Sequence, residues 1–366
     1  MKIERIEAIP YSIPYARALK FASGEVTAAE HVLVRIHTDT GICGVADTPP
    51  RPYTYGETQD SIVSVITKVF APLVIGLDPM DRSKVQQILH RTVNNPTAKG
   101  AVDIALWDII GIAVETPVHK LLGGYADGMR VSHMLGFKPA DELLDEAQRF
   151  RENYGITTFK LKTGRRPLSL DVEACRVLRE GLGEKAEIYM DANRGWTATE
   201  ALEVLRRTEG LGVSMLEEPC DAGEVLGRRR LVEQSNIPIV GDESVPTLGD
   251  VARELLTGGS TAVCIKTARS GFTEAQKILA LCEGLGVDVT MGNQIDTQVG
   301  SLATVTFGAA FEASSRRAGE LSNFLDMTDD LLADPLEIRG GIIRVRETPG
   351  VGAQIDPDKL QKYRQD

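Results

Sequence analysis

Six charged residues each stand at or near the end of a short apolar segment in the second half of the chain. They are Lys160, Lys162, Asp191, Glu217, Asp242 and Lys266. From Lys162 onward, successive members are 24 to 29 residues apart, which is about the length of one strand and one helix. Because the carboxyl ends of the parallel strands in an α/β barrel meet at one mouth, we expect these side chains to converge there.

The three acidic members of this series suit a hard metal ion. Asp191, Glu217 and Asp242 offer only carboxylate oxygens, the donors that Mg²⁺ or Mn²⁺ prefers, and no His or Cys belongs to the pattern, as a zinc site would require. A single acidic residue at a strand end is more often a helix cap or a solvated residue, but three at barrel spacing favour a site. Glu218 and Glu243 leave the register open by one residue, since neighbours on a strand face opposite sides.

The three lysines predict proton transfer at carbon. Lys160 and Lys162 share one face of their strand, and Lys266 ends the sixth strand, across the barrel from the second. Two close, partly buried cations disfavour each other's charged form, which lowers a lysine pKa and supplies a neutral amine as base. Opposed lysines beside a metal ion could move a proton to or from the carbon next to a carboxylate.

The elements that must position these residues form a repeated pattern. Eight short apolar segments alternate with amphipathic segments, at residues 131–137, 157–162, 187–193, 213–218, 237–243, 262–266, 287–292 and 318–322. The alternation predicts an α/β fold, a modified TIM barrel of the (β/α)7β type.

The first part of the chain follows a different pattern, and we expect an N-terminal α+β capping domain there. Alternating strands at 3–9 and 31–37, a turn at 38–44 and helical spacing at 57–75, 81–93 and 101–114 indicate a small antiparallel sheet followed by helices. The predicted boundaries are 1–125 for the cap and 126–334 for the barrel, with residues 335–366 returning to the cap. Residues 20–25 and 48–57, rich in Gly, Pro or small residues, are either lids or ordinary connecting loops.

Composition limits the partners. The formal net charge is −11 and no basic block occurs, so nucleic acid is an unsuitable ligand. Five cysteines without a CxxC pair fit reduced thiols, and neither a signal peptide nor a long apolar run is recognisable, so we expect a cytoplasmic protein without membrane contact. An anionic substrate would need local positive charge in this acidic chain.

Taken together, the motifs resemble the muconate lactonizing subgroup of the enolase superfamily over nearly the whole chain. The matching elements are Lys160-Leu161-Lys162, Asp191-Ala192-Asn193, Glu217-Glu218-Pro219, Asp242-Glu243-Ser244 and Lys266, with the helix at 98–108. On the eighth strand, Gly319-Glu320-Leu321-Ser322 is similar to the Glu-Leu element of muconate cycloisomerases, whereas dipeptide epimerases typically carry Asp-x-Asp. Segments 49–58, 130–137, 291–300 and 316–327 also look like those of actinobacterial muconate cycloisomerases.

The resemblance implies a Mg²⁺- or Mn²⁺-dependent homo-oligomer, from dimer to octamer, that converts the dicarboxylate cis,cis-muconate to muconolactone in aromatic catabolism. It implies Asp191, Glu217 and Asp242 as metal ligands. Lys162 would be the acid that protonates the α-carbon, Lys266 its electrostatic partner or the alternative acid, and Lys160 and Glu320 would complete the catalytic set.

Substrate contacts are expected from loops around the mouth. The candidates are Asn193, Asn293, Gln294 and Asp296, with Arg51, Tyr53 and residues 20–25 as lid contacts. The segment 292–296 departs from the Met-Leu-Glu pattern of many family members, so its groups cannot be copied from the family, and a solvated loop is the alternative.

Three rival functions remain open. N-succinylamino acid racemisation or o-succinylbenzoate synthesis would use the same lysines and metal. A Schiff-base aldolase would use Lys162 or Lys266 covalently, although the three carboxylates argue against it. The third is a barrel that only binds or scaffolds, since a fold by itself does not imply catalysis.

Overall fold

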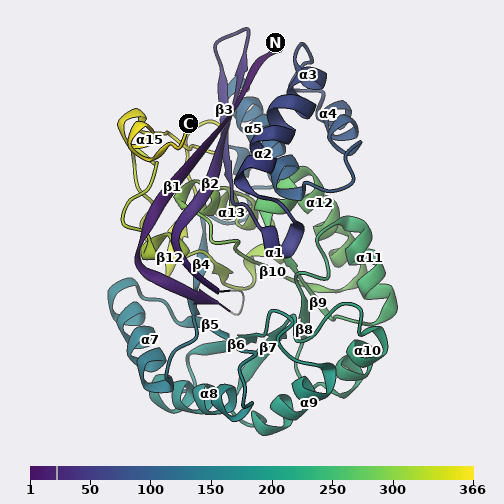
Figure 1. Ribbon diagram of the computed structural model, residues 1–366, viewed down its shortest axis with the longest axis vertical. Coiled ribbons are helices and arrows are strands. Elements are labelled where there is room, and N and C mark those ends of the chain that lie inside the picture. Colours follow the sequence, from purple (N-terminus) through teal and green to yellow (C-terminus); the bar gives the residue numbers. More distant parts are fainter. Residues whose placement is uncertain (22–23) are drawn as a thin grey trace.

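The computed structural model describes residues 1–21 and 24–366, and Figure 1 shows a cap placed over one end of a barrel. The cap holds a three-stranded antiparallel sheet in the order β1 (Ile3–Phe21), β2 (Gly24–Thr38), β3 (Cys43–Thr48). Its helices are α1 (Pro52–Tyr55), α2 (Gln59–Val65), the π-helical η1 (Ile66–Phe70), α3 (Ala71–Val74), α4 (Arg82–Leu89), α5 (Pro96–Ala113) and α6 (Val118–Leu122). The predicted capping sheet and helices are confirmed.

The predicted barrel is also confirmed, because eight parallel strands follow one another in a nearly closed sheet. The strands are β4 (Gly128–Leu135), β5 (Thr158–Lys162), β6 (Glu187–Asp191), β7 (Val213–Glu217), β8 (Ile239–Gly241), β9 (Ala262–Ile265), β10 (Asp288–Met291) and β11 (Gly319–Glu320). The helices between them are α7 (Ala140–Tyr154), α8 (Ser169–Leu182), α9 (Ala198–Arg207), α10 (Val225–Gln234), α11 (Leu248–Thr257), α12 (Thr267–Leu285), α13 (Gln298–Gly308) and the short α14 (Glu312–Ser315).

Local sequence explains where these helices begin and end. Thr197 caps α9 by accepting from the Glu200 N–H, while the Glu200 side chain returns to the Thr197 N–H, which satisfies two amide groups at the helix start. Gly155 ends α7 in the left-handed region at φ 75°, which costs glycine no steric energy. The helix expected at 101–114 begins earlier, at Pro96, because proline fits the first helical turn, where no N–H is needed.

Two cap elements differ in length from the sequence patterns. The first strand continues to Phe21 instead of ending near residue 9, because β2 pairs with it over nearly its whole length. The helical stretch expected from 57 to 75 is divided into α2, η1 and α3, with a wide π turn at Ile66–Phe70.

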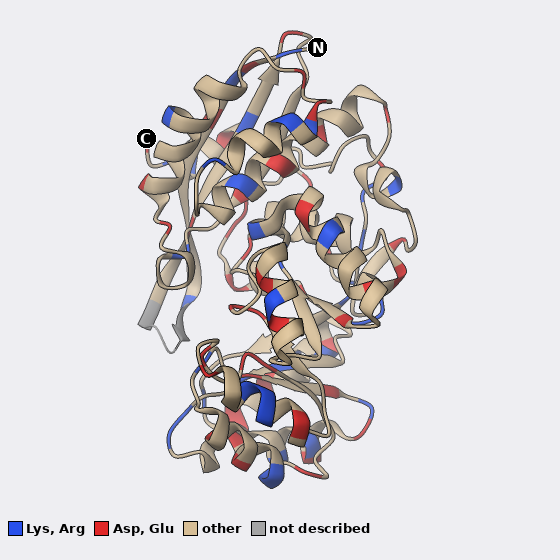
Figure 2. Cartoon of the chain, turned by 90° about the vertical axis from the view of Figure 1, so that its right-hand side faces the viewer, with Lys and Arg blue, Asp and Glu red and all other residues tan. Residues whose placement is uncertain are grey.

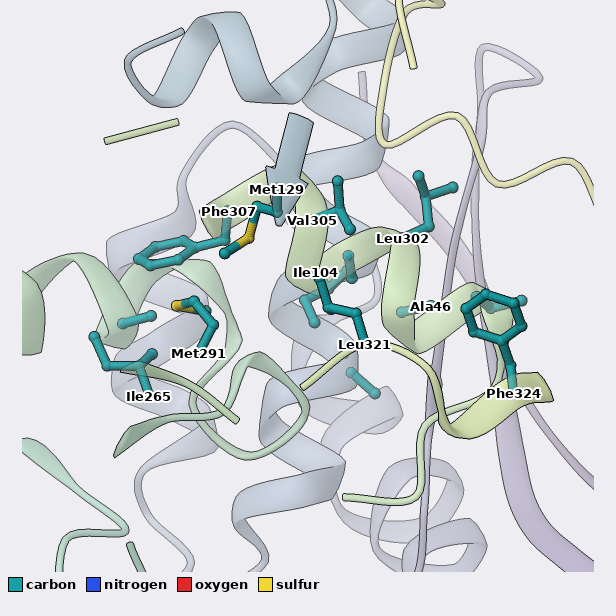
Figure 3. Packing of buried hydrophobic residues seen from close by; sticks show 14 of the residues in the cluster. Ala46, Ile104, Met129, Ile265, Met291, Leu302, Val305, Phe307, Leu321 and Phe324 are labelled. Atoms are coloured by element: carbon teal, nitrogen blue, oxygen red, sulfur yellow. The ribbon is translucent and has the colours of Figure 1, made fainter. Parts of the chain in front are cut away.

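One apolar core joins the cap to the barrel. Helix α5 is buried along most of its length, and Figure 3 shows Ile104 of α5 close to Leu302 and Val305 of α13. Met129 of β4, Met291 of β10 and Phe307 of α13 extend the same cluster into the barrel. The cap is therefore packed against the barrel through apolar contact.

The C-terminal segment contacts both the barrel and the cap. Strand β12 (Ile342–Arg344) pairs antiparallel with β4, and helix α15 (Pro357–Tyr363) follows it. The Gln365 N–H then donates to the Pro10 carbonyl of β1 at 2.9 Å. In the view of Figure 2, acidic and basic residues are interspersed along the helices. Among the described residues, no helix is both long and apolar enough to cross a bilayer.

Candidate active site

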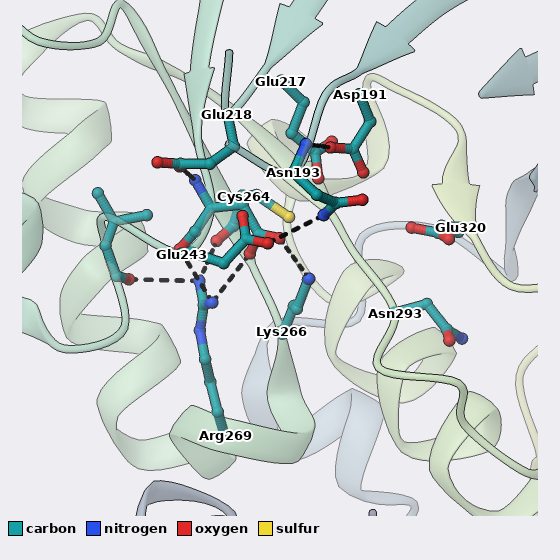
Figure 4. Close-up of polar contacts among 12 residues, drawn as sticks. Asp191, Asn193, Glu217, Glu218, Glu243, Cys264, Lys266, Arg269, Asn293 and Glu320 are labelled. Carbon is teal, nitrogen blue, oxygen red and sulfur yellow. Dashed lines mark hydrogen bonds and ion pairs between the residues drawn. The ribbon is translucent and has the colours of Figure 1, made fainter. Parts of the chain in front are cut away.

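The charged strand ends meet at one mouth of the barrel, where Figure 4 shows Asp191, Glu217 and Lys266 near one another. Figure 1 shows the cap placed over one end of the barrel. Lys162, Asp191 and Glu217 pair directly in register on the adjacent strands β5, β6 and β7. Asp242 follows β8 and Lys266 follows β9. The structure thus brings together the residues that the barrel spacing predicted, since parallel strands carry their carboxyl ends to one rim.

Lys160 lies at the centre of a carboxylate cage. Its Nζ donates to Glu217 Oε1 at 2.7 Å and to Glu320 Oε2 at 2.9 Å, and it lies 2.9 Å from Asp191 Oδ2. The side chain is 1% exposed. Burial alone would lower the pKa of Lys160, but the three carboxylates raise it well above the usual lysine value. The expectation that close lysines lower one another's pKa is therefore wrong for Lys160.

Lys162 occupies the outer position on the same strand. Its Nζ donates to Asp191 Oδ2 at 2.6 Å and to Asn193 Oδ1 at 2.7 Å. Asn193 in turn donates from Nδ2 to Glu243 Oε1 at 2.9 Å. The chain of contacts orients Lys162 through Asn193, a residue that the sequence singled out as a substrate contact.

Lys266 and Arg269 hold Asp242 from two sides. Lys266 Nζ donates to Asp242 Oδ2 at 2.5 Å, and Arg269 Nη1 donates to Asp242 Oδ1 at 2.9 Å. Burial would lower the pKa of Lys266, but Asp242 raises it, which keeps the ammonium charged. Arg269 Nη1 also donates to the Tyr55 hydroxyl of α1 at 2.9 Å, so the cap reaches the barrel rim here.

Carboxylate and thiol groups form a compact donor set at the rim. Among the described residues, ligand atoms of Glu217, Asp242 and Cys264 lie within 4.8 Å of one another. Asp191 is not part of this set, and its Oδ2 is in contact with the Nζ atoms of Lys160 and Lys162. The carboxylate oxygens of Glu217 and Asp242 are donors that a divalent cation such as Mg²⁺ prefers.

The positions of Glu218 and Glu243 show, in part, which member of each acidic pair faces the site. Glu218 turns away from the mouth, since its Oε2 accepts from the Asp242 N–H at 2.6 Å and its Oε1 accepts from Arg228 at 3.1 Å. Glu217 is left facing the site. Glu243 also borders the site through Asn193, and its Oε2 is buried without a hydrogen-bond partner.

The buried carboxyl groups at the rim have pKa values shifted in opposite directions. Burial raises the pKa of Glu217, and the charges of Asp191 and Asp242 raise it further against the opposing effect of Lys160. Burial would do the same to Asp191, but Lys160 and Lys162 hold its pKa below the usual range. A cluster of buried carboxyls in which one member is forced toward its neutral form is the environment that a bound cation relieves.

The loop after β10 is buried rather than solvated. Asn293, Gln294 and Asp296 are between 1% and 6% exposed. Asn293 Nδ2, both amide atoms of Gln294 and Asp296 Oδ1 are buried without a partner. Buried polar atoms are normally paired, so this loop offers hydrogen-bonding groups to a bound molecule.

The lid candidates Arg51 and Tyr53 differ in how far they are buried. Arg51 is half-buried and its Nε is buried without a partner, but Tyr53 is 77% exposed and is not brought to the site. Tyr55, two residues later, takes the inward position. Of the segment 20–25, residues 22–23 lie outside the described residues, and the side chains of the segment are not described.

Three residues at the site escaped the sequence patterns. Cys264 stands two residues before Lys266 and so shares its face, a signal that the period of a strand could have provided. Arg269 lies one helical turn beyond Lys266, at the start of α12. For Tyr55 the sequence offers no signal that separates it from Tyr53.

Comparison with known proteins places the chain in a family. Residues 6–123 match the family model for the mandelate racemase / muconate lactonizing enzyme N-terminal domain, and residues 142–359 match that for the enolase C-terminal domain-like family. A muconate lactonizing enzyme from M. smegmatis, crystallised with muconolactone, is 57% identical with a TM-score of 0.98, over 100% of both chains.

Curated relatives are more distant and catalyse different reactions. An L-Ala-D/L-Glu epimerase from Bacillus subtilis is 30% identical over 96% of each chain. A chloromuconate cycloisomerase from Cupriavidus pinatubonensis is 29% identical over 96% of this chain and 95% of its own. From the two family models and these full-length matches, the chain belongs to the mandelate racemase/muconate lactonizing enzyme family of the enolase superfamily and is an isomerase-type enzyme.

Proposed function

We propose that this enzyme is a muconate cycloisomerase that closes cis,cis-muconate to muconolactone. The observation that carries the proposal is the 57% identity over the whole chain to a muconate lactonizing enzyme solved with muconolactone. The Lys160–Glu320 pair on β5 and β11 supports it, because the eighth strand carries Glu-Leu rather than the Asp-x-Asp expected of a dipeptide epimerase.

Asp191, Glu217 and Asp242 would hold Mg²⁺ or Mn²⁺, and the rim presents their oxygens together with positively charged side chains. When bound, the ion supplies positive charge that stabilises the enolate formed at one carboxylate of the substrate. Lys160 positions two of these ligands and Glu320 through its three contacts.

The reaction then needs one proton at carbon. One substrate carboxylate oxygen forms a bond to the distant alkene carbon, and the displaced π electrons move toward the other carboxylate. The Lys162 ammonium gives a proton to the α-carbon and is protonated again from solvent, so the closure takes up one proton overall. Lys266, which Asp242 keeps charged, stabilises the enolate from the other side.

The loop groups supply substrate recognition. Asn293 Nδ2 and Gln294 Nε2 are buried, unpartnered donors for the carboxylate or lactone oxygens, and Arg51 offers its guanidinium from the cap. Asp296 borders them with an unpartnered carboxylate oxygen. Asn193 orients Lys162. The substrate is then enclosed between the barrel rim and the cap, away from water.

The test is the ultraviolet absorbance of cis,cis-muconate, because lactonization destroys the conjugated diene. Enzyme with Mn²⁺ or Mg²⁺ is expected to abolish the absorbance, and chelator is expected to stop the reaction.

The competing proposal is racemisation or epimerisation, which the 30% identity to the epimerase favours. A dipeptide or an N-succinylamino acid turned over with a much higher kcat/KM than muconate would replace the cycloisomerase assignment.

A further inference from the structure

Three strands of the cap converge on one buried carboxylate. Asp47 of β3 accepts at Oδ2 from the Tyr11 hydroxyl of β1 at 2.7 Å, and His31 Nδ1 of β2 lies 2.8 Å from the same oxygen. From the barrel, Thr297 Oγ1 donates to it at 2.7 Å. Gly300 of α13 allows this approach, because a Cβ there would lie 2.9 Å from Asp47 Oδ1.

His31 has an acceptor at each ring nitrogen. Its Nδ1 faces the Asp47 carboxylate, and its Nε2 lies 3.1 Å from the carbonyl oxygen of Ile295. A carbonyl oxygen can only accept, and an ionised carboxylate can only accept, so both contacts require both nitrogens to carry hydrogen. His31 is 1% exposed, and this geometry makes it a buried imidazolium paired with Asp47.

The carbonyl that His31 holds belongs to a strained turn. Ile295 has φ 69°, a region that a β-branched residue rarely adopts. Within the turn, Asn293 Oδ1 accepts from the N–H groups of Ile295 and Asp296, at 2.6 and 2.9 Å. Since Asn293 uses its oxygen in this way, its Nδ2 has no hydrogen-bond partner, and neither do the amide atoms of Gln294 or Oδ1 of Asp296.

We propose that His31 of the cap is a positioning residue, which holds the loop 293–296 in its substrate-binding conformation through the Ile295 carbonyl and is itself held by Asp47. The loop effect stands on this geometry alone, and only its consequence for muconate binding rests on the proposed function. Removal of the Nε2 donor would leave the left-handed Ile295 without the contact that stabilises it, and the polar groups of the loop would no longer be fixed.

Two amide replacements separate the two contacts of His31. The amide nitrogen of Asn lies at about the place of Nδ1, so His31→Asn keeps a donor for Asp47 and loses the donor for Ile295. The amide nitrogen of Gln lies at about the place of Nε2, so His31→Gln keeps the donor for Ile295. Tyr11→Phe is the matched control, because it removes a different donor from Asp47 and leaves the Ile295 contact intact.

Hydrogen–deuterium exchange of the full-length protein measures the loop directly, because the Ile295 and Asp296 amides are bonded within the turn. In His31→Asn we expect a peptide covering 292–297 to exchange about tenfold faster, the factor for losing one charged hydrogen bond. His31→Gln is expected to exchange more slowly than His31→Asn, and Tyr11→Phe like the parent. A peptide from β6 must stay unchanged in all three, as a check on folding.

Steady-state kinetics measure the consequence for substrate binding. KM for cis,cis-muconate is expected to rise about tenfold in His31→Asn while kcat and Mn²⁺ affinity change little, because the lysines and carboxylates are untouched. Parent-like exchange in His31→Asn would overturn the proposal, and equal acceleration in both His31 variants would do so too, by assigning the effect to Asp47. If the parent protein does not convert muconate, the proposed function fails while the exchange result still decides the role of His31.

Discussion

At the scale of single residues, the barrel rim pairs buried carboxylates from several strands with buried lysines. Lys160 touches three acids from three strands, and Lys162 and Lys266 each touch one. Charge removed from one partner leaves the other buried and uncompensated, so substitutions here are expected to act strongly on chemistry.

The first prediction concerns the carboxylates. Asp191→Asn, Glu217→Gln and Asp242→Asn each remove a ligand charge, and each is expected to weaken Mn²⁺ binding and muconate turnover about a hundredfold or more. Calorimetric titration with Mn²⁺ and the muconate absorbance assay measure the two effects. Asp145→Asn, an exposed carboxylate on α7, is the matched control and should behave like the parent. Undiminished Mn²⁺ affinity in all three variants would contradict the assigned ligands.

The second prediction concerns the lysines. Lys162→Ala is expected to eliminate deuterium transfer from solvent to the α-carbon of muconolactone, because it removes the proposed acid. Lys266→Ala is expected to slow turnover while leaving some exchange, because it removes charge that stabilises the enolate. Nuclear magnetic resonance of the product formed in D₂O distinguishes the two. Exchange that survives in the Lys162 variant and disappears in the Lys266 variant would reverse the roles.

At the scale of elements, a buried arginine links helices α10 and α11 to the ends of strands β7 and β8. Arg228 of α10 donates to Glu254 of α11 at 2.8 Å and to Glu218 at 3.1 Å. Glu218 accepts in turn from the Asp242 N–H, so the network aligns the ends of β7 and β8. The relative position of Glu217 and Asp242 therefore depends on residues behind the rim.

The third prediction tests this network. Arg228→Met is expected to lower the free energy of unfolding by about 3–5 kcal/mol, because Glu218 and Glu254 would be buried without their cation. Denaturant unfolding measures the loss. Arg229→Met is the matched control, since Arg229 is exposed and pairs with Glu233 within one helix, where ion pairs contribute little. Similar losses in both variants would mean that the buried pairing is unimportant.

At the scale of the whole molecule, the proposed dicarboxylate substrate would have to bind to a protein with a net charge of −11. Lys160, Lys162 and Lys266 at the rim are each paired with carboxylates. Lys160, Lys162, Lys266 and Arg269 face five acids: Asp191, Glu217, Asp242, Glu243 and Glu320. A divalent ion would shift this balance toward the positive sign that a dicarboxylate requires.

The fourth prediction follows from that balance. Removal of divalent metal by chelator is expected to abolish binding of muconolactone, and not only turnover, and Mn²⁺ or Mg²⁺ is expected to restore it. Calorimetry with muconolactone before and after metal addition measures this. Equal affinity with and without metal would show that the protein's own cations suffice.

The fifth prediction concerns pH and the contact between cap and barrel. Burial opposes the charged form of His31, but Asp47 raises its pKa above 6.5; burial likewise opposes ionised Asp47, but His31 lowers its pKa below 3.8. The stabilisation from His31 is complete below pH 6.5 and is lost as pH rises through its raised pKa. That from Asp47 is complete above pH 3.8 and is lost as pH falls through its lowered pKa.

The stability difference between the parent and His31→Asn is therefore expected to be largest between about pH 4 and 6.5, at about 3 kcal/mol, and to shrink on both sides. Denaturant unfolding across pH measures it. Asp296 and Tyr11 also face His31, and burial raises the pKa of Asp296 to about 7, so Asp47→Asn is measured alongside. A difference that grows steadily above pH 7 would contradict the charged pair.

The sequence by itself determined the order of the barrel strands, the presence of an α+β cap and most of the charged residues at the rim. Strand and helix periods are local, and the carboxyl ends of parallel strands must share one rim, so the gathering of Lys162, Asp191 and Glu217 followed from spacing alone. Burial of the loop after β10 and the inward place of Tyr55 instead of Tyr53 did not follow, because both depend on where the cap rests on the barrel.

Tertiary structure alone decided which charged groups pair. Arg269 meets Tyr55 across 214 residues of chain, and His31 meets the Ile295 carbonyl across 264. The raised pKa of Lys160 likewise comes from carboxylates on three other strands. A local period predicts which face a side chain occupies, but its charge state and partners depend on side-chain packing between distant segments, where low dielectric strengthens each contact.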